Sequence, residues 1–310
     1  MAYCLKRSNV MKNSADKLDI AETIKLLKAA GFKKRKLLKS LEKLALEYST
    51  IVISGASSGI GQATLELVST LPKNILICNI SRSKSAIFFD RQDVENVPCD
   101  LSNLQEIDAA FLQIEKLRQV RGIRGGKILL INNSGFGGYG LFPEPNNAHN
   151  CNMIDVNVRG LTYLTGLFIP LIREFGGGVI NVASTAAWQP CPYLSVYAAT
   201  KAYVMSFSLA LDYELKKFGA RALCLCPGPT TTNFFKRAGF DERPLKANFG
   251  HEASDVAQAM LIAYAYGKNL KIVGLLNSVV AWLNYFIPRS VMGRISGFIL
   301  AKVRGQNLKK

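Results

Sequence analysis

Three tyrosines in the sequence precede a lysine by four residues, the spacing that places both side chains on one face of a helix. The pairs are Tyr197/Lys201, Tyr213/Lys217 and Tyr264/Lys268. In such a pair the ammonium group favours the phenolate and lowers the tyrosine pKa from its usual value of about 10, which suits a proton donor to a carbonyl. Spacing alone indicates a general acid but does not choose among the three pairs.

Position along the chain favours the first pair. Tyr197 follows an apolar run that ends in Ser184, across a short connection with two prolines that can fold back over a site. The other two tyrosines come late in their predicted helices, where we expect solvated faces. Tyr197, Lys201 and Ser184 are therefore the candidate catalytic groups.

A glycine-rich loop lies upstream, between an apolar run at 51–54 and a predicted helix at 62–71. It reads SGASSGIG over residues 54–61. Glycines let a backbone turn tightly and approach a phosphate, while the free amides and the dipole of a helix N-terminus bind the anion. We expect this loop to hold the pyrophosphate of a dinucleotide through Gly55, Ser57, Ser58, Gly59, Ile60 and Gly61.

A second glycine pattern, GFGGYG at 135–140, also follows an apolar run. The segment LFPEP after it cannot open a helix, because proline restricts the backbone and lacks an amide donor. We interpret this second pattern as a loop on the substrate side.

The residues that end the second predicted strand should select the dinucleotide. A carboxylate there would hydrogen-bond the ribose 2′-hydroxyl of NAD, whereas an arginine would accommodate a 2′-phosphate. The chain reads NISRSK over 79–84, with no carboxylate before Asp90. The sequence therefore favours NADP(H) over NAD(H), with Arg82 contacting the phosphate. The alternative for Arg82 is an ordinary solvated arginine in a loop.

Short apolar runs alternate with segments of helical periodicity from residue 50 onward. The runs cover 51–54, 75–79, 94–98, 127–132, 178–183 and 221–226. Continuous apolar runs are typical of strands buried on both faces. The clearest helix is 102–120, with Ser102 as the expected N-cap. This alternation predicts an α/β fold with a Rossmann-type doubly wound parallel sheet, whose ligands bind at the carboxyl ends of the strands.

The net charge of +17 is concentrated at the two ends of the chain. Residues 1–50 hold 12 Lys and Arg against five Asp and Glu, and residues 268–310 hold eight against none. The nearly neutral body argues against a nucleic-acid partner, and the basic ends favour peripheral contact with a negatively charged membrane surface. Seven cysteines without paired spacing, and no secretory apolar segment after Met1, predict a cytoplasmic location.

We divide the chain into a basic helical extension at 1–49, a catalytic domain at 50–267 and a basic amphipathic segment at 268–310. Apolar residues at helical spacing predict two helices in the extension, with a break at 30–32. The basic run at 33–36 is interpreted as a solvated face, and membrane or partner contact is the alternative.

The C-terminal segment predicts two amphipathic helices. In the first, residues 272–287, Asn277, Ala281 and Asn284 form one stripe and larger apolar residues fill the opposite side. A bilayer span takes about 20 predominantly apolar residues, so neither helix is expected to cross a membrane. Basic edges favour an interfacial position. A helical cap on the active site and a dimer arm are the alternatives.

Short motifs follow one another in a distinctive order from residue 54 onward. After the glycine loop they are CDLS (99–102), NNSG (132–135), DVNVRG (155–160), Ser184, YAATK (197–201) and PGPT (227–230). Together they resemble the short-chain dehydrogenase/reductase family over roughly residues 50–267. Thr200 stands where this family usually has serine.

The resemblance implies a role for each matching residue. Tyr197 would be the general acid/base, Lys201 would lower its pKa and hold the nicotinamide ribose, and Ser184 would polarise the substrate carbonyl. Asn157 would hold a water in a proton relay to Lys201. The other implied cofactor contacts are Asp100 and Leu101 at the adenine, Asn132 as a support, and Pro227, Gly228, Thr230 and Thr232 on the nicotinamide side.

Segments 135–140, 227–235 and 273–277 resemble the DltE-like, ketoacyl reductase-like subgroup of this family. If the fold is right, apolar residues surround the substrate, namely Leu141, Phe142, Trp188, Phe234 and Phe235. An apolar mouth beside a basic amphipathic tail favours a lipid-like ketone or a 3-ketoacyl chain over a sugar.

We therefore expect an NADP(H)-dependent oxidoreductase that interconverts a carbonyl and a secondary alcohol on a hydrophobic (ketoacyl, lipid or steroid-like) substrate. The alternative is a non-catalytic dinucleotide-binding regulatory or scaffold protein at a membrane surface. The resemblance also implies a homo-oligomer, formed through the helices that bear Asn157 and Tyr197. No metal site is expected, because His149 and His251 are the only histidines and lie far apart in the sequence.

Overall fold

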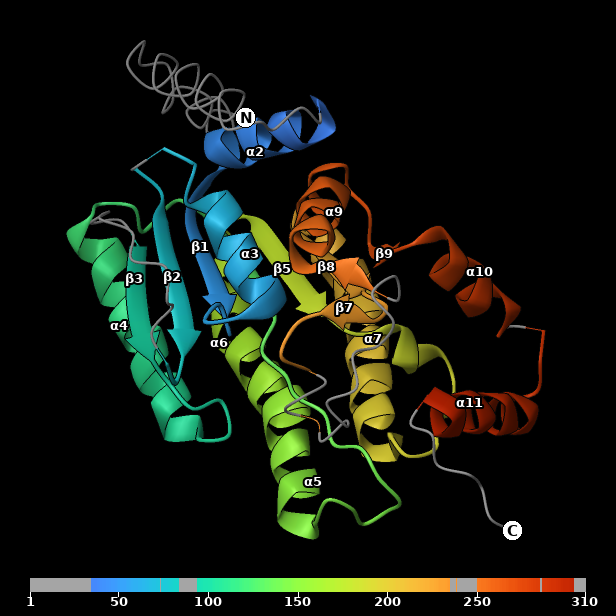
Figure 1. Ribbon diagram of the computed structural model, residues 1–310. Helices are drawn as coiled ribbons and strands as arrows, with labels where there is room; N and C mark the ends of the chain where they lie inside the picture. Colours follow the sequence, from blue (N-terminus) through green and yellow to red (C-terminus); the bar gives the residue numbers. More distant parts are fainter. Residues whose placement is uncertain are drawn as a thin grey trace.

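The computed structural model describes residues 35–72, 74–83, 94–234, 238, 250–284 and 286–303. Its central sheet has seven parallel strands in the order β3-β2-β1-β4-β5-β6-β9 (Figure 1). The strands are β1 (Tyr48–Ser54), β2 (Leu76–Ser81), β3 (Val94–Pro98), β4 (Lys127–Asn132), β5 (Gly177–Val182), β6 (Arg221–Cys226) and β9 (Leu270–Ile272). The predicted Rossmann-type sheet and its six strands are confirmed. The short strand β9 was not predicted, because its three residues form no continuous buried apolar run.

Helices cover both faces of this sheet. On one face lie α2 (Arg35–Glu47), α3 (Gly59–Val68) and α9 (Ala253–Ala265), and on the other lie α4 (Leu104–Val120), α6 (Leu161–Phe175) and α7 (Ser195–Lys216). Alternate residues of a strand therefore enter different cores. Ile51 and Ile53 pack against α3 and α9, whereas Val52 packs toward α4 and α6. Because both faces of the sheet are buried, the sequences of its strands are continuous apolar runs.

The order of the strands reverses between β1 and β4, which pair directly in the middle of the sheet. The chain leaves β1 for β2 and β3 on one side, and it returns to β4, β5 and β6 on the other. The loops after β1 and β4 consequently diverge over opposite halves of the sheet. In a doubly wound fold, the expected ligand site is the crevice at the position where the strand order reverses.

Part of the predicted N-terminal extension belongs to the main core. Helix α2 buries Leu37, Leu41 and Leu44 against the face that also holds α9. The first predicted helix of the extension and the basic residues Lys33 and Lys34 lie outside the described residues. The described end of the extension is thus a packed element that leads directly into β1.

The structure corrects the predicted start of α4. Asn103 is the N-cap, and its side chain accepts hydrogen bonds from the amides of Gln105 and Glu106. Ser102 instead donates its hydroxyl to Asp100 at 2.8 Å. Helix α3 likewise begins at Gly59, three residues before the predicted start.

Two tyrosines that were expected on solvated helix faces have different environments. Tyr213 is exposed, as predicted. Tyr264 is fully buried, and its hydroxyl forms a hydrogen bond of 2.7 Å with that of Tyr48. The prediction for Tyr264 is wrong because its partner lies 216 residues away in the chain, where helical periodicity gives no information.

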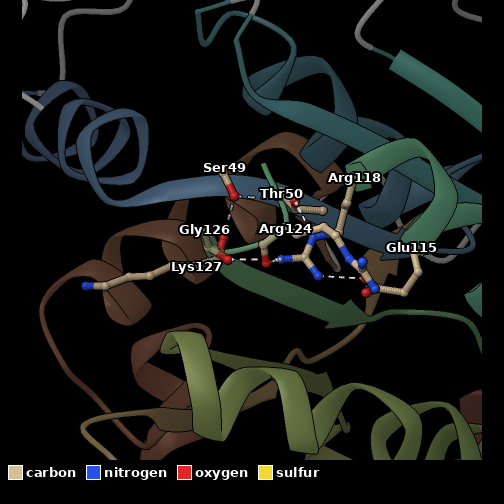
Figure 2. Close-up of polar contacts among 7 residues, drawn as sticks. All are labelled: Ser49, Thr50, Glu115, Arg118, Arg124, Gly126 and Lys127. Carbon is tan, nitrogen blue, oxygen red and sulfur yellow. Dashed lines mark hydrogen bonds and ion pairs between the residues drawn. The ribbon is translucent and has the colours of Figure 1, made fainter. Parts of the chain in front are cut away.

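A buried arginine ties the end of α4 to the sheet (Figure 2). Arg118 is 0% exposed and forms an ion pair of 2.6 Å with Glu115. Its guanidinium also donates to the carbonyls of Arg124 and Gly126 and to the hydroxyl of Thr50. These contacts fix the turn that leads into β4, which positions the strand carrying the loop at the crevice.

The remaining helical elements surround the open end of the sheet. Helix α5 (Asn147–Ile154) continues through a π-helical turn, η1 (Asp155–Gly160), into α6, and η2 (Thr185–Trp188) is a 3₁₀ turn after β5. The short strands β7 (Thr230–Thr231) and β8 (His251–Glu252) pair with each other. The C-terminal segment forms α10 (Leu275–Leu283) and α11 (Arg289–Val303), which lie on the opposite side of the molecule from α4 (Figure 1).

Candidate active site

A cavity of about 680 Å³ occupies the crevice at the carboxyl ends of the strands. It extends from the glycine loop after β1 to the first turns of α7 and to α11. It brings together most of the residues predicted for the site, namely Gly55, Ser57, Ser58, Gly59, Ile60, Arg82, Asp100, Leu101, Ser184, Tyr197, Lys201, Pro227, Gly228, Thr230 and Thr232. The remaining three, Gly61, Asn132 and Asn157, lie behind this surface.

The glycine loop has the backbone that its sequence requires. Gly55 and Gly59 have φ angles of +72° and +60°, values that residues with a Cβ atom rarely adopt. Ser58 is the N-cap of α3, but its side chain makes no capping hydrogen bond. The first amides of α3 therefore remain available to an anion in the cavity.

Asn133 holds this loop from below, a role that the sequence did not reveal. Its side-chain amide donates to the carbonyls of Ser54 and Gly55, both at 3.1 Å. Gly61 packs against the same amide, and a Cβ atom at Gly61 would collide with Asn133 and with the carbonyl of Gly55. Gly61 thus allows close packing behind the cradle and does not line the cavity.

Asn132, predicted as a cofactor support, is buried beneath the cavity. Its amide donates to Thr165 and Asn181 at 2.8 Å, so it joins β4 to α6 and β5. Successive residues of an extended chain point in opposite directions. Asn132 therefore points into the core, whereas the next residue, Asn133, points toward the glycine loop. The NNSG motif indicated the region, but the sequence could not choose between its two asparagines.

Tyr197 lies near the start of α7 with its phenol at the cavity. Tyr197 is 9% exposed, and the Ser184 side chain lies near its hydroxyl. Burial raises the pKa of Tyr197 to about 12, and the Ser184 side chain opposes this rise. The phenol is therefore protonated at neutral pH, the state that a proton donor needs.

Lys201 lies one turn further along α7, as its spacing predicts. Its Nζ atom donates to the carbonyl of Val182 at 2.8 Å and lies 5.8 Å from the ring centre of Tyr197. Burial lowers the pKa of Lys201 from 10.5 to about 8. The expected lowering of the tyrosine pKa by Lys201 is not found in the protein alone, because burial of the phenol dominates.

Asn157 is completely buried in the π-helical turn between α5 and α6. Its amide donates to the carbonyl of Phe136 and to the Thr200 hydroxyl, while its oxygen accepts from the amide of Phe136. Thr200 in turn donates to the carbonyl of Tyr197 at 2.7 Å. Asn157 and Thr200 therefore join the substrate-side loop to the helix that carries Tyr197 and Lys201. Thr200, singled out only as a departure from the family pattern, has a positioning role here.

Arg82 and Asp100 form the far end of the cavity. Their side chains make an ion pair of 3.6 Å, and Arg82 is largely exposed. Burial would raise the pKa of Asp100, but hydrogen bonds from Ser102 and the charge of Arg82 hold it below its usual value. The Arg82 guanidinium lies beside β2 with donors that face solvent, and an anionic group could approach it there.

The opposite end of the cavity is apolar. Phe234 lines it, as predicted, and its ring lies 5.2 Å from that of Tyr197. Leu141 and Phe142 are instead exposed and do not line the cavity, because the loop after residue 140 turns outward to α5; Trp188 does not line it either. Phe235 lies outside the described residues. Additional apolar lining comes from Phe136, in the loop predicted on the substrate side, and from Leu194, Ile299 and Leu300, which were not predicted to line the site.

The shape and chemistry of this cavity fit a dinucleotide. The glycine cradle and the free end of α3 suit a pyrophosphate, and the segment 227–232 approaches the cradle from the other side. A Cβ atom at Gly59 would lie 3.1 Å from the Thr232 methyl group, so the two walls are close together there. A Cβ atom at Gly135 would approach both the Lys201 ammonium and the Asn157 oxygen, so the glycine keeps the space beside these two groups open.

Comparisons with known proteins agree with this geometry. Residues 49–243 match the model of the short chain dehydrogenase family. The chain is 27% identical to an uncharacterized oxidoreductase of Staphylococcus aureus over 225 residues, which cover 71% of this chain and 93% of the relative. An uncharacterized oxidoreductase of Schizosaccharomyces pombe is 29% identical over 171 residues, 54% of this chain and 56% of that protein.

Solved structures of related proteins share the fold. A short-chain dehydrogenase of Sphingobium yanoikuyae, in complex with NADPH, has a TM-score of 0.62 and 25% identity, covering 78% of this chain and 97% of that one. A 3-ketoacyl-(acyl-carrier-protein) reductase of Brucella melitensis, complexed with NADH, has the same TM-score and identity, and the match covers 74% of this chain and 97% of that one. The likeness to the DltE-like subgroup stays a prediction. From its sequence match and its fold, this chain belongs to the short chain dehydrogenase family and is an oxidoreductase.

Proposed function

We propose that the protein is an NADPH-dependent reductase of hydrophobic ketones or 3-ketoacyl chains, with Tyr197 as the proton donor. The observation that carries this proposal is the Tyr197 phenol, which lines the cavity together with Ser184 and Lys201, between the glycine cradle and the apolar end. A non-catalytic scaffold would leave this convergence of Ser184, Tyr197, Lys201 and Asn157 without a purpose.

In this proposal the bound dinucleotide supplies the hydride to the carbonyl carbon. The glycine cradle and α3 hold its pyrophosphate, and Lys201 holds the nicotinamide ribose. Ser184 donates a hydrogen bond to the substrate oxygen and Tyr197 delivers a proton to it, since burial keeps the phenol protonated at neutral pH. Asn157 and Lys201 both lie beside Gly135, an arrangement that supports a proton relay through a water between them.

The preference for NADPH rests on Arg82 at the end of β2. An exposed guanidinium at this position can pair with a 2′-phosphate, whereas a carboxylate would be required for a free 2′-hydroxyl. The solved relatives are named with either NADPH or NADH, so the family alone does not select the cofactor.

The substrate class rests on the apolar end of the cavity. Phe136, Leu194 and Phe234 lie near Tyr197, and Ile299 and Leu300 extend this lining toward the surface. Such a wall favours burial of a hydrocarbon chain over a polyhydroxylated substrate.

The wider setting of the enzyme is also part of the proposal. We infer a homo-oligomer through α5, η1 and α7, which is supported by an apolar surface hollow lined by Phe142, Ile154, Val158 and Val196. We further infer a cytoplasmic enzyme in peripheral contact with a membrane. Among the helices that the structure describes, none has both the length and the apolar character needed to cross a bilayer.

The test is a screen of NADPH oxidation over ketones of graded chain length, with wild-type protein and Tyr197→Phe. General acid catalysis contributes about 10²- to 10⁴-fold, so the variant should lose at least about 100-fold in kcat while it still binds NADPH. Tyr213→Phe, at an exposed tyrosine of the same helix with the same spacing to a lysine, is the matched control and should keep full activity. Full activity of Tyr197→Phe would refute the mechanism. NADPH binding without turnover of any ketone would favour the scaffold alternative.

A further inference from the structure

The outer side of α10 and α11 carries a large set of exposed apolar side chains, here called the apolar platform. It consists of Leu275, Leu276, Val279, Val280, Trp282, Leu283, Phe286, Val291, Ile295, Phe298 and Ile299. Leu275 is 85% exposed and Leu276 is 74% exposed. These side chains come from two consecutive helices, and soluble monomers seldom expose so many large apolar side chains in one segment, so the platform indicates a contact with another apolar phase or partner.

Helix α10 packs its polar side, rather than its apolar side, against the protein. Its polar stripe faces inward: Asn284 donates to Gln189 at 3.1 Å, and the Asn277 amide lies against Gly228 and 3.5 Å from the His251 ring nitrogen. Ala281, between them, is only 2% exposed. A surface helix of a soluble protein normally buries its apolar side. In α10 the polar side contacts the rest of the protein, and the apolar side is exposed to solvent.

The basic residues of the same chain segment favour an anionic partner for the platform. Lys268, Lys271, Arg289, Arg294 and Lys302 lie in the same segment, and residues 268–310 contain no Asp or Glu. A second copy docked on this face would bring like charges together, whereas anionic lipid headgroups would attract them, at about 1 kcal/mol per basic residue. The rings of Trp282 and Phe286 lie 4.7 Å apart, centre to centre, in a tilted arrangement, and aromatic side chains suit the boundary between headgroups and acyl chains.

The platform is continuous with the proposed substrate pocket through α11. Ser296 donates to the carbonyl of Pro190 at 2.6 Å, which holds α11 against the connection before Tyr197. Ile299 is about half exposed on the platform and also lines the cavity, next to Leu300. One side chain therefore belongs both to the free apolar surface and to the wall of the pocket.

We propose that the apolar platform docks on an anionic phospholipid surface, and that the cavity opens toward this surface so that a hydrophobic carbonyl compound enters from the bilayer. The docking follows from the platform and its charges alone. The entry route rests on the proposed function.

The docking is tested by sedimentation of the full chain with vesicles of phosphatidylcholine and phosphatidylserine, and with vesicles of phosphatidylcholine alone. We expect binding to the anionic vesicles that weakens with salt. The double variant Leu276→Asn, Trp282→Asn should bind at least about tenfold more weakly, because each large side chain would lose its apolar contact. Neither residue lines the cavity. Leu112→Asn, Val120→Asn, at exposed apolar positions of α4, is the matched control and should bind as wild type does.

Three results would overturn the docking. If the wild type sediments with neither kind of vesicle, the platform has no lipid partner and the docking is refuted. Equal binding by the platform variant and its control would place the lipid contact elsewhere on the chain. Self-association that the platform variant abolishes, without any vesicle binding, would identify a second copy as the partner.

The entry route is tested with two ketones, a short water-soluble one and a long-chain one carried in the anionic vesicles. The platform variant should lose about tenfold in kcat/KM for the vesicle-borne ketone and keep the wild-type value for the soluble one. Equal losses for both ketones, or no loss for either, would refute the entry route. If the wild type reduces neither ketone, the proposed function fails, whereas vesicle binding still decides the docking separately.

Discussion

Replacing Lys201 by methionine should stabilise the folded protein although it removes a proposed catalytic group. Lys201 is 4% exposed, and its ammonium donates to a neutral backbone carbonyl, that of Val182. Burial lowers its pKa from 10.5 to about 8. At about 1.4 kcal/mol per pKa unit, burial of this cation costs the folded state about 3 kcal/mol. Methionine has a similar length, carries no charge and fills the same space.

The sign of the effect depends on pH in a defined way. Below pH 8 the lysine is charged in both states, and the full cost is present. Between pH 8 and 10.5 the folded protein releases its proton first, so the unfolded chain binds more protons and the wild type becomes more stable as the pH rises. The variant lacks this titration. Loss of the hydrogen bond to Val182 costs it about 1 kcal/mol at every pH, which leaves a net gain of about 2 kcal/mol near neutral pH.

Urea unfolding followed by circular dichroism, from about pH 7 to about pH 10, measures this difference. The advantage of Lys201→Met should fall by roughly 2 to 3 kcal/mol over that range, because the folded wild type loses its proton there and the unfolded chain keeps it. Lys217→Met, at an exposed lysine of the same helix, is the control and should change the stability by less than about 0.5 kcal/mol at each pH. A pH-independent difference, or a variant that is less stable throughout, would refute the reasoning.

Three further substitutions test other parts of the structure. Arg82→Ala should weaken NADPH binding by about tenfold or more and NADH binding little, as measured by calorimetry; equal losses would show that Arg82 does not contact the phosphate. Arg118→Met should lower the free energy of unfolding by about 3 kcal/mol in urea, because Glu115 and two carbonyls lose their partner, and a loss below about 1 kcal/mol would contradict this. Gly55→Ala should abolish NADPH binding in a fluorescence titration, since φ is +72° and the new methyl group would meet Ser134; unchanged affinity would show that the loop adapts.

Much of the catalytic region could be predicted because its signals are local. Strands buried on both faces are read from single apolar runs, and the one-turn separation of Tyr197 and Lys201 follows from helical spacing. The choice of Tyr197 over Tyr213 and Tyr264 needed only its distance from the end of the preceding strand. Of the three tyrosines, Tyr197 is the one that lines the cavity, and its catalytic role stays a prediction.

Other features depend on partners that are distant in sequence. The burial of Tyr264 requires Tyr48, and the role of Asn133 requires the loop at Ser54 and Gly55. Of the neighbouring residues Asn132 and Asn133, only the second contacts that loop. No local sequence pattern shows in which direction each side chain points. The pKa of Tyr197 likewise depends on the burial that surrounding elements impose.

The C-terminal helix α10 shows which information comes from the sequence and which comes from the tertiary structure. By itself the sequence determined that α10 has a polar stripe and an apolar stripe, because periodicity assigns residues to faces. Only the tertiary structure decided which face meets the protein, because Gln189, 95 residues from Asn284, supplies the hydrogen-bond partner that turns the polar stripe inward. The motifs of the chain identify an oxidoreductase, and its three-dimensional contacts give that oxidoreductase an exposed apolar surface next to its active site.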